Sequence, residues 1–286
     1  MRLGVFVSGN LGYNVLNHLH DKYMVKFVFT DSKSKSIIDF CNTNNIDLFV
    51  GNPRNEESNK FYQSKPIEVL ISVNYLFLIE KKLISHPSIL AFNLHGSLLP
   101  KYRGRTPHVW AIINNETKTG ITAHVIDEGC DSGDIIEQFE IEINRKDTGN
   151  DILNKYNKQY IPIIDSVLFK IENKTITTQI QNHSHATYFG KRTPEDGEIN
   201  WVWQKERIYN WVRAQAFPYP GSFTHYNNYK IIIDEIEFSN FGYDNNMPNG
   251  LILSVSPLLV KTTNGVIKIN KIRVVDLELR AGGIFQ

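Results

Sequence analysis

The sequence has only two cysteines, Cys41 and Cys130, too few for a disulfide framework or a cysteine-based structural zinc site. It also lacks long hydrophobic runs. No stretch approaches the roughly 18 apolar residues of a membrane-spanning helix, and the apolar segment after Met1 is too short for a signal peptide. Neither sign of charge dominates, because 31 Lys and Arg balance 30 Asp and Glu to a formal net charge of +1. This balance argues against a polyanion such as tRNA. We therefore expect a cytoplasmic enzyme or binding protein with no membrane or nucleic-acid partner.

Short apolar segments alternate with helical patterns over the first hundred residues. This alternation predicts an α/β fold with a mostly parallel sheet and helices on both faces. Ligands of such sheets bind outside the carboxyl ends of the strands. The spacing Gly9-x-x-Gly12 predicts a tight strand-to-helix turn and is not a dinucleotide fingerprint. The predicted strands are Arg2 to Val7, Met24 to Phe29, Ile46 to Val50, Glu68 to Val73 and Ile89 to Leu94.

Two polar side chains, Asn93 and His95, lie at the end of the apolar run from Ile89 to Leu94. They are two residues apart, so in an extended strand they point the same way. A second polar patch, Gly129 to Asp134, carries Asp131. A strand-end Asn-x-His pair with a loop aspartate predicts an acyl-transfer site. Taken alone, the pair is also compatible with turn capping, and the aspartate with an Asx turn.

The middle of the chain mixes helices and strands. We predict an antiparallel pair, Gly120 to Asp127 with Asp134 to Ile143, and a helix from about residue 148 to 172 that Pro162 should kink or divide. The composition changes near Gln181, and we place a domain boundary after residue 190. A catalytic domain, residues 1–190, is thus followed by a small domain, residues 191–286. That domain has one helix around Gln204 to Ala216 and then a β-rich pattern.

Several stretches together resemble the folate-dependent formyltransferases. That superfamily includes methionyl-tRNA formyltransferase, glycinamide ribonucleotide transformylase and the sugar N-formyltransferases. The resemblance covers about two thirds of the chain and implies a Rossmann-like catalytic domain, a small β-rich domain and 10-formyltetrahydrofolate as donor. Its shared motifs are Asn93-x-His95, Ser97-Leu98-Leu99-Pro100-x-Tyr102-x-Gly104 and Gly129 to Asp134. The stretches most like the sugar enzymes are Leu99 to Pro107 and Lys191 to Trp201.

Formyl transfer needs an oxyanion donor, a base for the attacking amine and an acid for the leaving nitrogen. Asn93 can donate an amide N–H to the oxyanion. His95 titrates near neutrality and can act as base and then acid, or bind the oxyanion when protonated. Asp131 can orient His95, stabilise its cation or relay protons through water. The sequence leaves these roles of Asp131 open.

The resemblance also indicates where the ligands bind. The residues expected at the folate are Tyr75, Phe77, Leu78, Ile79 and Asp127. The residues expected at a substrate diphosphate are Lys101, Tyr102, Arg103, Arg105, Lys191 and Arg192, although the basic cluster is also compatible with a solvated loop. We expect His108 and His124 to be structural or peripheral, and we expect no metal site.

The resemblance thus implies an N-formyltransferase acting on a dTDP-4-amino-4,6-dideoxyhexose for surface glycan (O-antigen) biosynthesis. Its partners are folate and the nucleotide-linked amino sugar. The alternatives are methionyl-tRNA formyltransferase and a non-catalytic folate or nucleotide-sugar binding protein. The amino position and the C4 epimer stay open. Exposed edge strands near the end of the chain could pair two chains into a homodimer.

Overall fold

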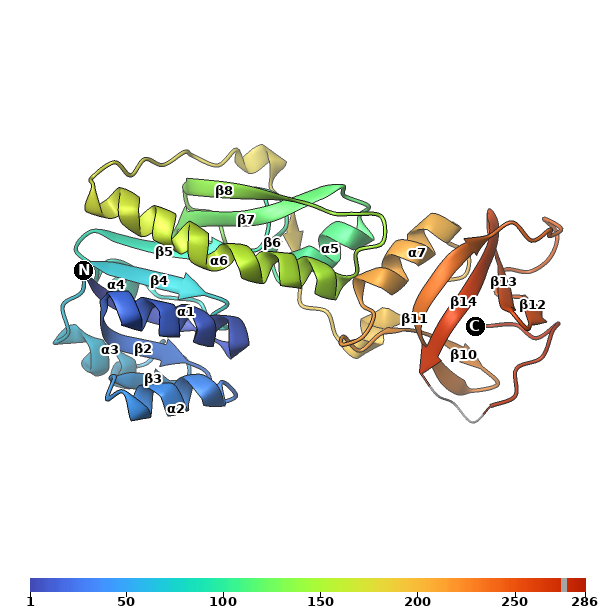
Figure 1. Ribbon diagram of the computed structural model, residues 1–286, viewed down its shortest axis with the longest axis horizontal. Helices are drawn as coiled ribbons and strands as arrows, with labels where there is room; N and C mark the ends of the chain where they lie inside the picture. Colours follow the sequence, from blue (N-terminus) through green and yellow to red (C-terminus); the bar gives the residue numbers. More distant parts are fainter. Residues whose placement is uncertain (274–276) are drawn as a thin grey trace. The chain divides into compact units, whose positions relative to one another are not determined.

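The computed structural model describes residues 1–273 and 277–286 and divides into two compact units (Figure 1). Unit 1 comprises Met1–Gly104, Gly120–Ile141 and Lys155–Tyr188. Unit 2 comprises Arg105–Thr119, Glu142–Asn154 and Phe189–Gln286. The long segment of unit 2 begins at Phe189, but two earlier pieces also belong to that unit. The domain division after residue 190 stays a prediction.

A seven-stranded sheet has the order β3-β2-β1-β4-β5-β7-β8. The five strands from β3 to β5 are parallel, and β7 pairs antiparallel with β5. The mostly parallel sheet predicted from the sequence is confirmed. Its strands are β1 (Arg2–Val7), β2 (Met24–Thr30), β3 (Leu48–Val50), β4 (Val69–Val73), β5 (Leu90–His95), β7 (Lys118–Val125) and β8 (Ile135–Glu142). All of β4 is buried, as expected for a strand covered on both faces.

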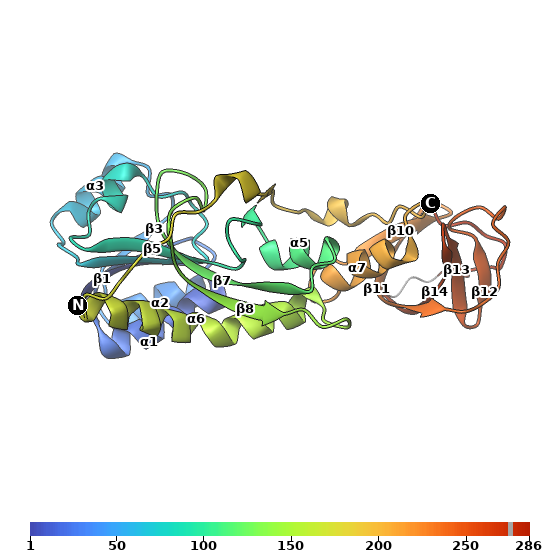
Figure 2. The same cartoon turned by 90° about the horizontal axis from the view of Figure 1, so that it is seen from above.

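Helices cover both faces of this sheet, as Figure 2 shows. One face carries α1 (Gly9–Lys22), α2 (Lys35–Thr43) and α6 (Gly149–Glu172), and the other carries α3 (Glu56–Gln63). A phenylalanine cluster of Phe6, Phe27 and Phe29 packs beneath α3. Helix α6 is continuous and is not divided at Pro162. The buried residues after the proline, including Ile163 and Ile164, explain why one lost backbone hydrogen bond does not end the helix.

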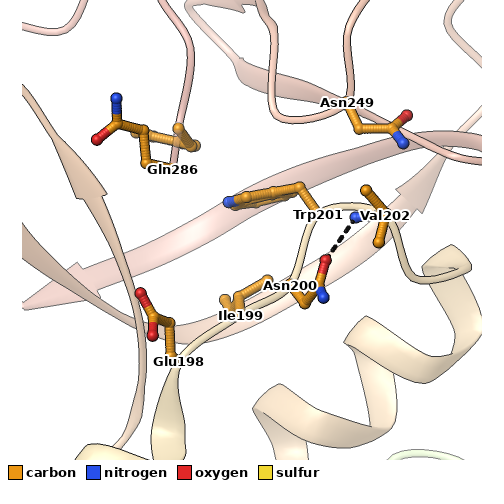
Figure 3. Close-up of a pocket in the computed structure, with 8 residues that line it drawn as sticks. Glu198, Ile199, Asn200, Trp201, Val202, Asn249 and Gln286 are labelled. Atoms are coloured by element: carbon orange, nitrogen blue, oxygen red, sulfur yellow. Dashed lines mark hydrogen bonds between the residues drawn. The ribbon is translucent and has the colours of Figure 1, made fainter.

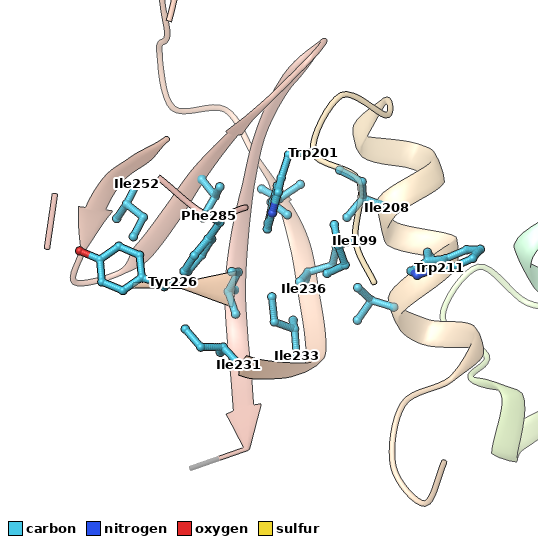
Figure 4. Close-up of a cluster of buried hydrophobic side chains, with 14 residues drawn as sticks. Ile199, Trp201, Ile208, Trp211, Tyr226, Ile231, Ile233, Ile236, Ile252 and Phe285 are labelled. Atoms are coloured by element: carbon cyan, nitrogen blue, oxygen red, sulfur yellow. The ribbon is translucent and has the colours of Figure 1, made fainter. Parts of the chain in front are cut away.

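Unit 2 contains a five-stranded antiparallel sheet with the order β10-β11-β14-β13-β12. The predicted β-rich part of the chain is therefore confirmed. Its elements are α7 (Lys205–Ala214), β10 (Ser222–Tyr226), β11 (Tyr229–Ser239), β12 (Ile252–Val255), β13 (Leu258–Thr262) and β14 (Gly265–Arg273). The sequence pattern predicts a last strand from Val266 to Val275, of which residues 274 and 275 lie outside the described residues. Figure 4 shows the core between α7 and this sheet, with Trp201 stacked on Phe285.

Several short elements complete the chain. They are α4 (Lys81–Ile84), β6 (Arg103–Gly104), α5 (Pro107–Ile113), β9 (Tyr188–Phe189) and the 3-10 turns η1 (His183–His185) and η2 (Pro194–Gly197). No helix in the described ranges is long and apolar enough to cross a membrane.

Candidate functional site

Strand β5 brings Asn93 and His95 to the carboxyl end of the parallel strands, as predicted. Asn93 lies opposite Ser72 of β4 on one side and His124 of β7 on the other. The His95 side chain is buried, with 7% of its surface exposed. His95 lies 3.5 Å from Asp131, and Asn93 lines the same pocket as Asp131. The structure therefore brings the three predicted catalytic residues together.

Asp131 lies between two histidines. Its Oδ2 is 3.5 Å from His95 Nδ1, and its Oδ1 is 3.6 Å from His124 Nε2. Its backbone has a φ of +53°, and Oδ2 accepts a hydrogen bond of 2.9 Å from the Gly104 N–H. Burial by itself raises the pKa of this carboxyl, but the neighbouring His95 and the Gly104 N–H hold that pKa well below its ordinary value. Asp131 is therefore an ionised carboxylate at neutral pH.

The hydrogen bonds of His95 decide which of its nitrogens carries the proton. Nε2 lies 2.8 Å from the Tyr102 carbonyl oxygen, which can only accept, so Nε2 is the donor. Nδ1 then presents its lone pair toward Asp131. Burial lowers the pKa of His95, while Asp131 opposes that effect. The net effect lowers the pKa of His95, and a proton taken up at Nδ1 would face the carboxylate.

His124 was expected to be structural or peripheral, but it lines the pocket of the candidate site. Its Nδ1 donates to the Val125 carbonyl oxygen at 2.8 Å. Its Nε2 is therefore free to accept, and the Asn93 amide donates to it at 3.1 Å. This bond orients the Asn93 amide and leaves the second N–H of that amide for another acceptor. The place of His124 in the site follows from the pairing of β7 with β5, which the sequence pattern did not predict.

The loop that follows β5 is fixed by polar residues of β7 and β8. Thr122 Oγ1 donates to the Ser97 carbonyl oxygen at 2.6 Å and accepts from the Leu99 N–H at 3.2 Å. Gln138 Nε2 donates at 2.9 Å to both the Leu99 carbonyl oxygen and Thr122 Oγ1. The loop thereby holds the two backbone groups that contact the site, the Tyr102 carbonyl and the Gly104 N–H.

A pocket of about 130 Å³ opens beside these residues, within unit 1. All five residues predicted at the folate line it, namely Tyr75, Phe77, Leu78, Ile79 and Asp127. Asn93, His124 and Asp131 line the same pocket. Tyr75 is held by a hydrogen bond from its hydroxyl to the Gly51 carbonyl oxygen at 3.1 Å. An apolar wall and the reactive polar groups thus share one cavity.

The predicted substrate residues of the loop after β5 lie in different surroundings. Lys101 and Arg105 are exposed, whereas Tyr102 is buried. Arg103 is only 1% exposed, and its guanidinium donates to side chains of the segment near residue 185. These acceptors are the Tyr188 hydroxyl, Gln181 Oε1 and His183 Nδ1.

The other two predicted substrate residues, Lys191 and Arg192, lie in unit 2. Lys191 is exposed. The Arg192 guanidinium lies between two indole rings, 5.0 Å from the Trp110 centroid and 4.4 Å from the Trp211 centroid. It also donates to Gln215 Oε1 at 3.0 Å. Two aromatic rings therefore lie within cation–π distance of this guanidinium.

A second pocket, of about 430 Å³, lies in unit 2 over Trp201. Figure 3 shows the amide side chains of Asn249 and Gln286 on either side of the indole. Glu198 is the one titratable side chain among its lining residues, and it lies 3.4 Å from His225 Nδ1. Across residues 1–273 and 277–286, no cluster of three His, Cys, Asp or Glu side chains could hold a metal ion.

The sequence matches two formyl transferase domains. The formyl transferase family matches residues 5–168, and the formyl transferase C-terminal domain matches residues 191–276. The chain belongs to the formyl transferase family. The resemblance read from the motifs around Asn93, His95 and Asp131 is thus confirmed. Formyl transferases are enzymes, and this chain is an enzyme of that family.

The chain is also similar to a longer curated protein. The bifunctional polymyxin resistance protein ArnA of Wigglesworthia glossinidia brevipalpis is 33% identical over 264 residues. These residues are 90% of this chain and 39% of that protein. The chain therefore spans about two fifths of the length of this relative.

Two solved structures have a similar fold. An N-formyltransferase from Helicobacter canadensis, in complex with folinic acid and dTDP-3-aminofucose, has a TM-score of 0.73 at 23% identity, over 93% of this chain and 98% of that one. A 4-N formyltransferase from Francisella tularensis has a TM-score of 0.66 at 24% identity, over 78% of this chain and 91% of that one. At these identities the likeness shows a shared fold.

Proposed function

We propose that this formyl transferase moves a formyl group from 10-formyltetrahydrofolate to the amino group of a dTDP-linked 4-amino-4,6-dideoxyhexose. The observation that carries the proposal is that Asn93 and Asp131 line the pocket of the predicted folate residues, while His95 lies 3.5 Å from Asp131. The aromatic and aliphatic wall of Tyr75, Phe77 and Ile79 suits a flat heterocycle such as a pterin. The polar groups at its edge suit an acyl transfer.

The chemistry of the transfer assigns a task to each polar group. A bond forms between the amine nitrogen and the formyl carbon, the bond from that carbon to the donor nitrogen breaks, and one proton passes from amine to donor nitrogen. Asn93 donates its second amide N–H to the oxyanion that develops on the formyl oxygen. His95 accepts the amine proton at Nδ1 and returns it to the leaving nitrogen.

Asp131 stabilises the transient cation of His95. Its carboxylate is ionised and lies 3.5 Å from the nitrogen that gains the proton. In a buried site this attraction is stronger than in water. We therefore assign Asp131 an electrostatic and orienting role, with the Gly104 N–H fixing its position.

The substrate class rests on sequence resemblance and on relatives. The stretches Leu99 to Pro107 and Lys191 to Trp201 resemble sugar N-formyltransferases, and the Helicobacter canadensis relative was solved with dTDP-3-aminofucose. Lys101 and Arg105 are exposed cations near the site in sequence and would bind the diphosphate. The product would enter surface glycan synthesis, such as that of O-antigen.

A mass-spectrometric assay with 10-formyltetrahydrofolate tests this proposal. The panel contains dTDP-4-amino-4,6-dideoxyglucose, its galacto epimer, the 3-amino isomers, UDP-linked analogues and charged initiator tRNA. We expect a mass gain of one formyl group on a dTDP-linked 4-amino sugar. A gain on the 3-amino sugars or UDP sugars alone would correct the substrate, and a gain on tRNA alone would overturn the sugar assignment. Binding of folate and sugar without product would indicate a non-catalytic binding protein.

A further inference from the structure

The segment of residues 178–188, here called the tether, lies against two loops of unit 1. At its start, the backbone of Gln179 exchanges two hydrogen bonds of 2.8 Å with Ile135, directly after the Asp131 loop. Toward its end, Thr187 accepts from the loop after β5. The Tyr102 N–H donates to Thr187 Oγ1 at 2.9 Å, and the Arg103 N–H donates to the Thr187 carbonyl oxygen at 2.9 Å.

Gln181 is the buried side chain of this tether, with 2% of its surface exposed. Its Nε2 donates to the Asp131 carbonyl oxygen at 3.0 Å and to the Gly133 carbonyl oxygen at 2.6 Å. Its Oε1 accepts from Arg103 Nη2 at 2.6 Å. One amide therefore links the backbone that carries Asp131 to a side chain of the loop that contacts His95.

Both linked loops supply contacts to the candidate site. The loop after β5 supplies the Tyr102 carbonyl that accepts from His95 and the Gly104 N–H that donates to Asp131. The other loop holds Asp131 at a φ of +53°, a backbone conformation that non-glycine residues rarely adopt. Such a conformation persists where surrounding bonds fix it. The two Gln181 bonds to the carbonyls of this loop are bonds of that kind.

We infer that Gln181 is a positioning residue, which holds the Asp131 carboxylate against His95 through the Asp131 and Gly133 carbonyls. The inference rests on the proposed function for its effect on turnover. Gln181 lines neither pocket and touches no reacting group, so it acts through Asp131. The sequence itself shows only a change of composition near this residue.

The decisive variant is Gln181→Glu. It keeps the size of the side chain and an oxygen that accepts from Arg103, but it replaces the donor to the two carbonyls with a second oxygen. Misplacing a reacting group by about 1 Å can reduce the rate about 100-fold. We expect kcat to fall about 10- to 100-fold, while KM for folate and for sugar changes less than about twofold. Gln181→Met, which removes both the donor and the oxygen that accepts from Arg103 without adding a charge, should also lower kcat.

Gln179→Glu is the matched control. It makes the same chemical change two residues earlier, at an exposed side chain of the same tether. We expect this control to keep the kcat of the wild-type chain. Rates of Gln181→Glu and Gln181→Met within about twofold of wild type would overturn the inference.

A second measurement separates positioning from loss of structure. Asp131 raises the pKa of His95, while burial, His124 and Arg103 lower it. If Asp131 moves away, the pKa of His95 measured by NMR should fall in folded Gln181→Met. An unchanged His95 pKa, with activity lost in proportion to unfolded protein, would reduce Gln181 to a structural residue and overturn the inference. Because this titration needs no turnover, it also tests the inference if no substrate is formylated.

Discussion

Buried polar side chains have different roles in the two units. In unit 1, His95, His124 and Asp131 converge, and Asp131 and His124 line the pocket. In unit 2, the buried Arg213 instead donates to backbone, namely to the carbonyls of Asn144 and Asp147 at 3.3 and 2.6 Å. A polar group whose bonds end on backbone fixes a loop, whereas one that faces a cavity is available to a ligand. Substitution of these buried polar residues should therefore lower the turnover rate in unit 1 and the free energy of unfolding in unit 2.

The largest effect should follow the loss of the proton acceptor or its partner. His95→Ala and Asp131→Ala should each lower kcat/KM about 1,000-fold, because general acid–base catalysis contributes that order of rate. Formyl transfer measured by mass spectrometry gives the rate, and circular dichroism checks the fold. His18→Ala on α1 is a matched control that should keep activity. Turnover like that of wild type in either variant would remove that residue from the mechanism.

Removing the oxyanion donor should have the next largest effect. Asn93→Ala should lower kcat about 100- to 1,000-fold, as is typical for the loss of one donor to a developing oxyanion. Single-turnover kinetics at saturating substrate measures this step. Asn44→Ala, at an exposed position after α2, should leave the rate unchanged. A raised KM at unchanged kcat would instead assign Asn93 to ground-state binding.

In unit 2 the comparison predicts the opposite outcome. Arg213→Met leaves two carbonyls and the Asn210 amide without their charged donor. The free energy of unfolding should fall by about 3 kcal/mol, since hydrogen bonds to charged groups are stronger than neutral ones. Urea denaturation measures this change, with exposed Arg207→Met on the same helix as control. A loss of kcat without a loss of stability would contradict the division between the units.

An effect confined to acidic pH concerns His108 of unit 2. Burial lowers the pKa of His108 to about 4, from an ordinary value of 6.5. Between these values the unfolded chain binds a proton that the folded chain does not, so stability rises with pH in this window. Acidification from pH 6.5 to 4 should therefore remove about 3 kcal/mol of stability through this group. His108→Gln can still bond to the Tyr219 hydroxyl. In this variant the free energy of unfolding should depend less on pH between 4 and 6.5. Urea denaturation at several pH values measures the difference.

Much of the fold could be predicted from the sequence, because parallel strands buried on both faces appear as short apolar runs. The predicted strand from Arg2 to Val7 has the bounds of β1, and the predicted run ending at Leu94 stops one residue before the end of β5. Asn93 and His95 could be placed at the sheet edge because a strand's end is a local property. Helix α6 was harder, since the effect of Pro162 depends on packing that is not local.

The remainder of the site depends on contacts between distant segments. His124 enters because β7 pairs antiparallel with β5, and no periodicity within β7 indicates its neighbour. The burial of Arg103 depends on Gln181, which lies 78 residues later in the chain. A basic residue in a loop is usually solvated, so the sequence alone gave no reason to expect a buried guanidinium.

All the tryptophans lie in one of the two units, and this distribution has an experimental use. All four, Trp110, Trp201, Trp203 and Trp211, belong to unit 2, and none lies in the segments of unit 1. Intrinsic tryptophan fluorescence therefore observes one half of the molecule, while formyl transfer depends on the geometry of the other. In one denaturant titration, the fluorescence and the activity each give their own transition midpoint. Coincident midpoints would mean that both units melt as one cooperative body, and separated midpoints would give the order in which they unfold.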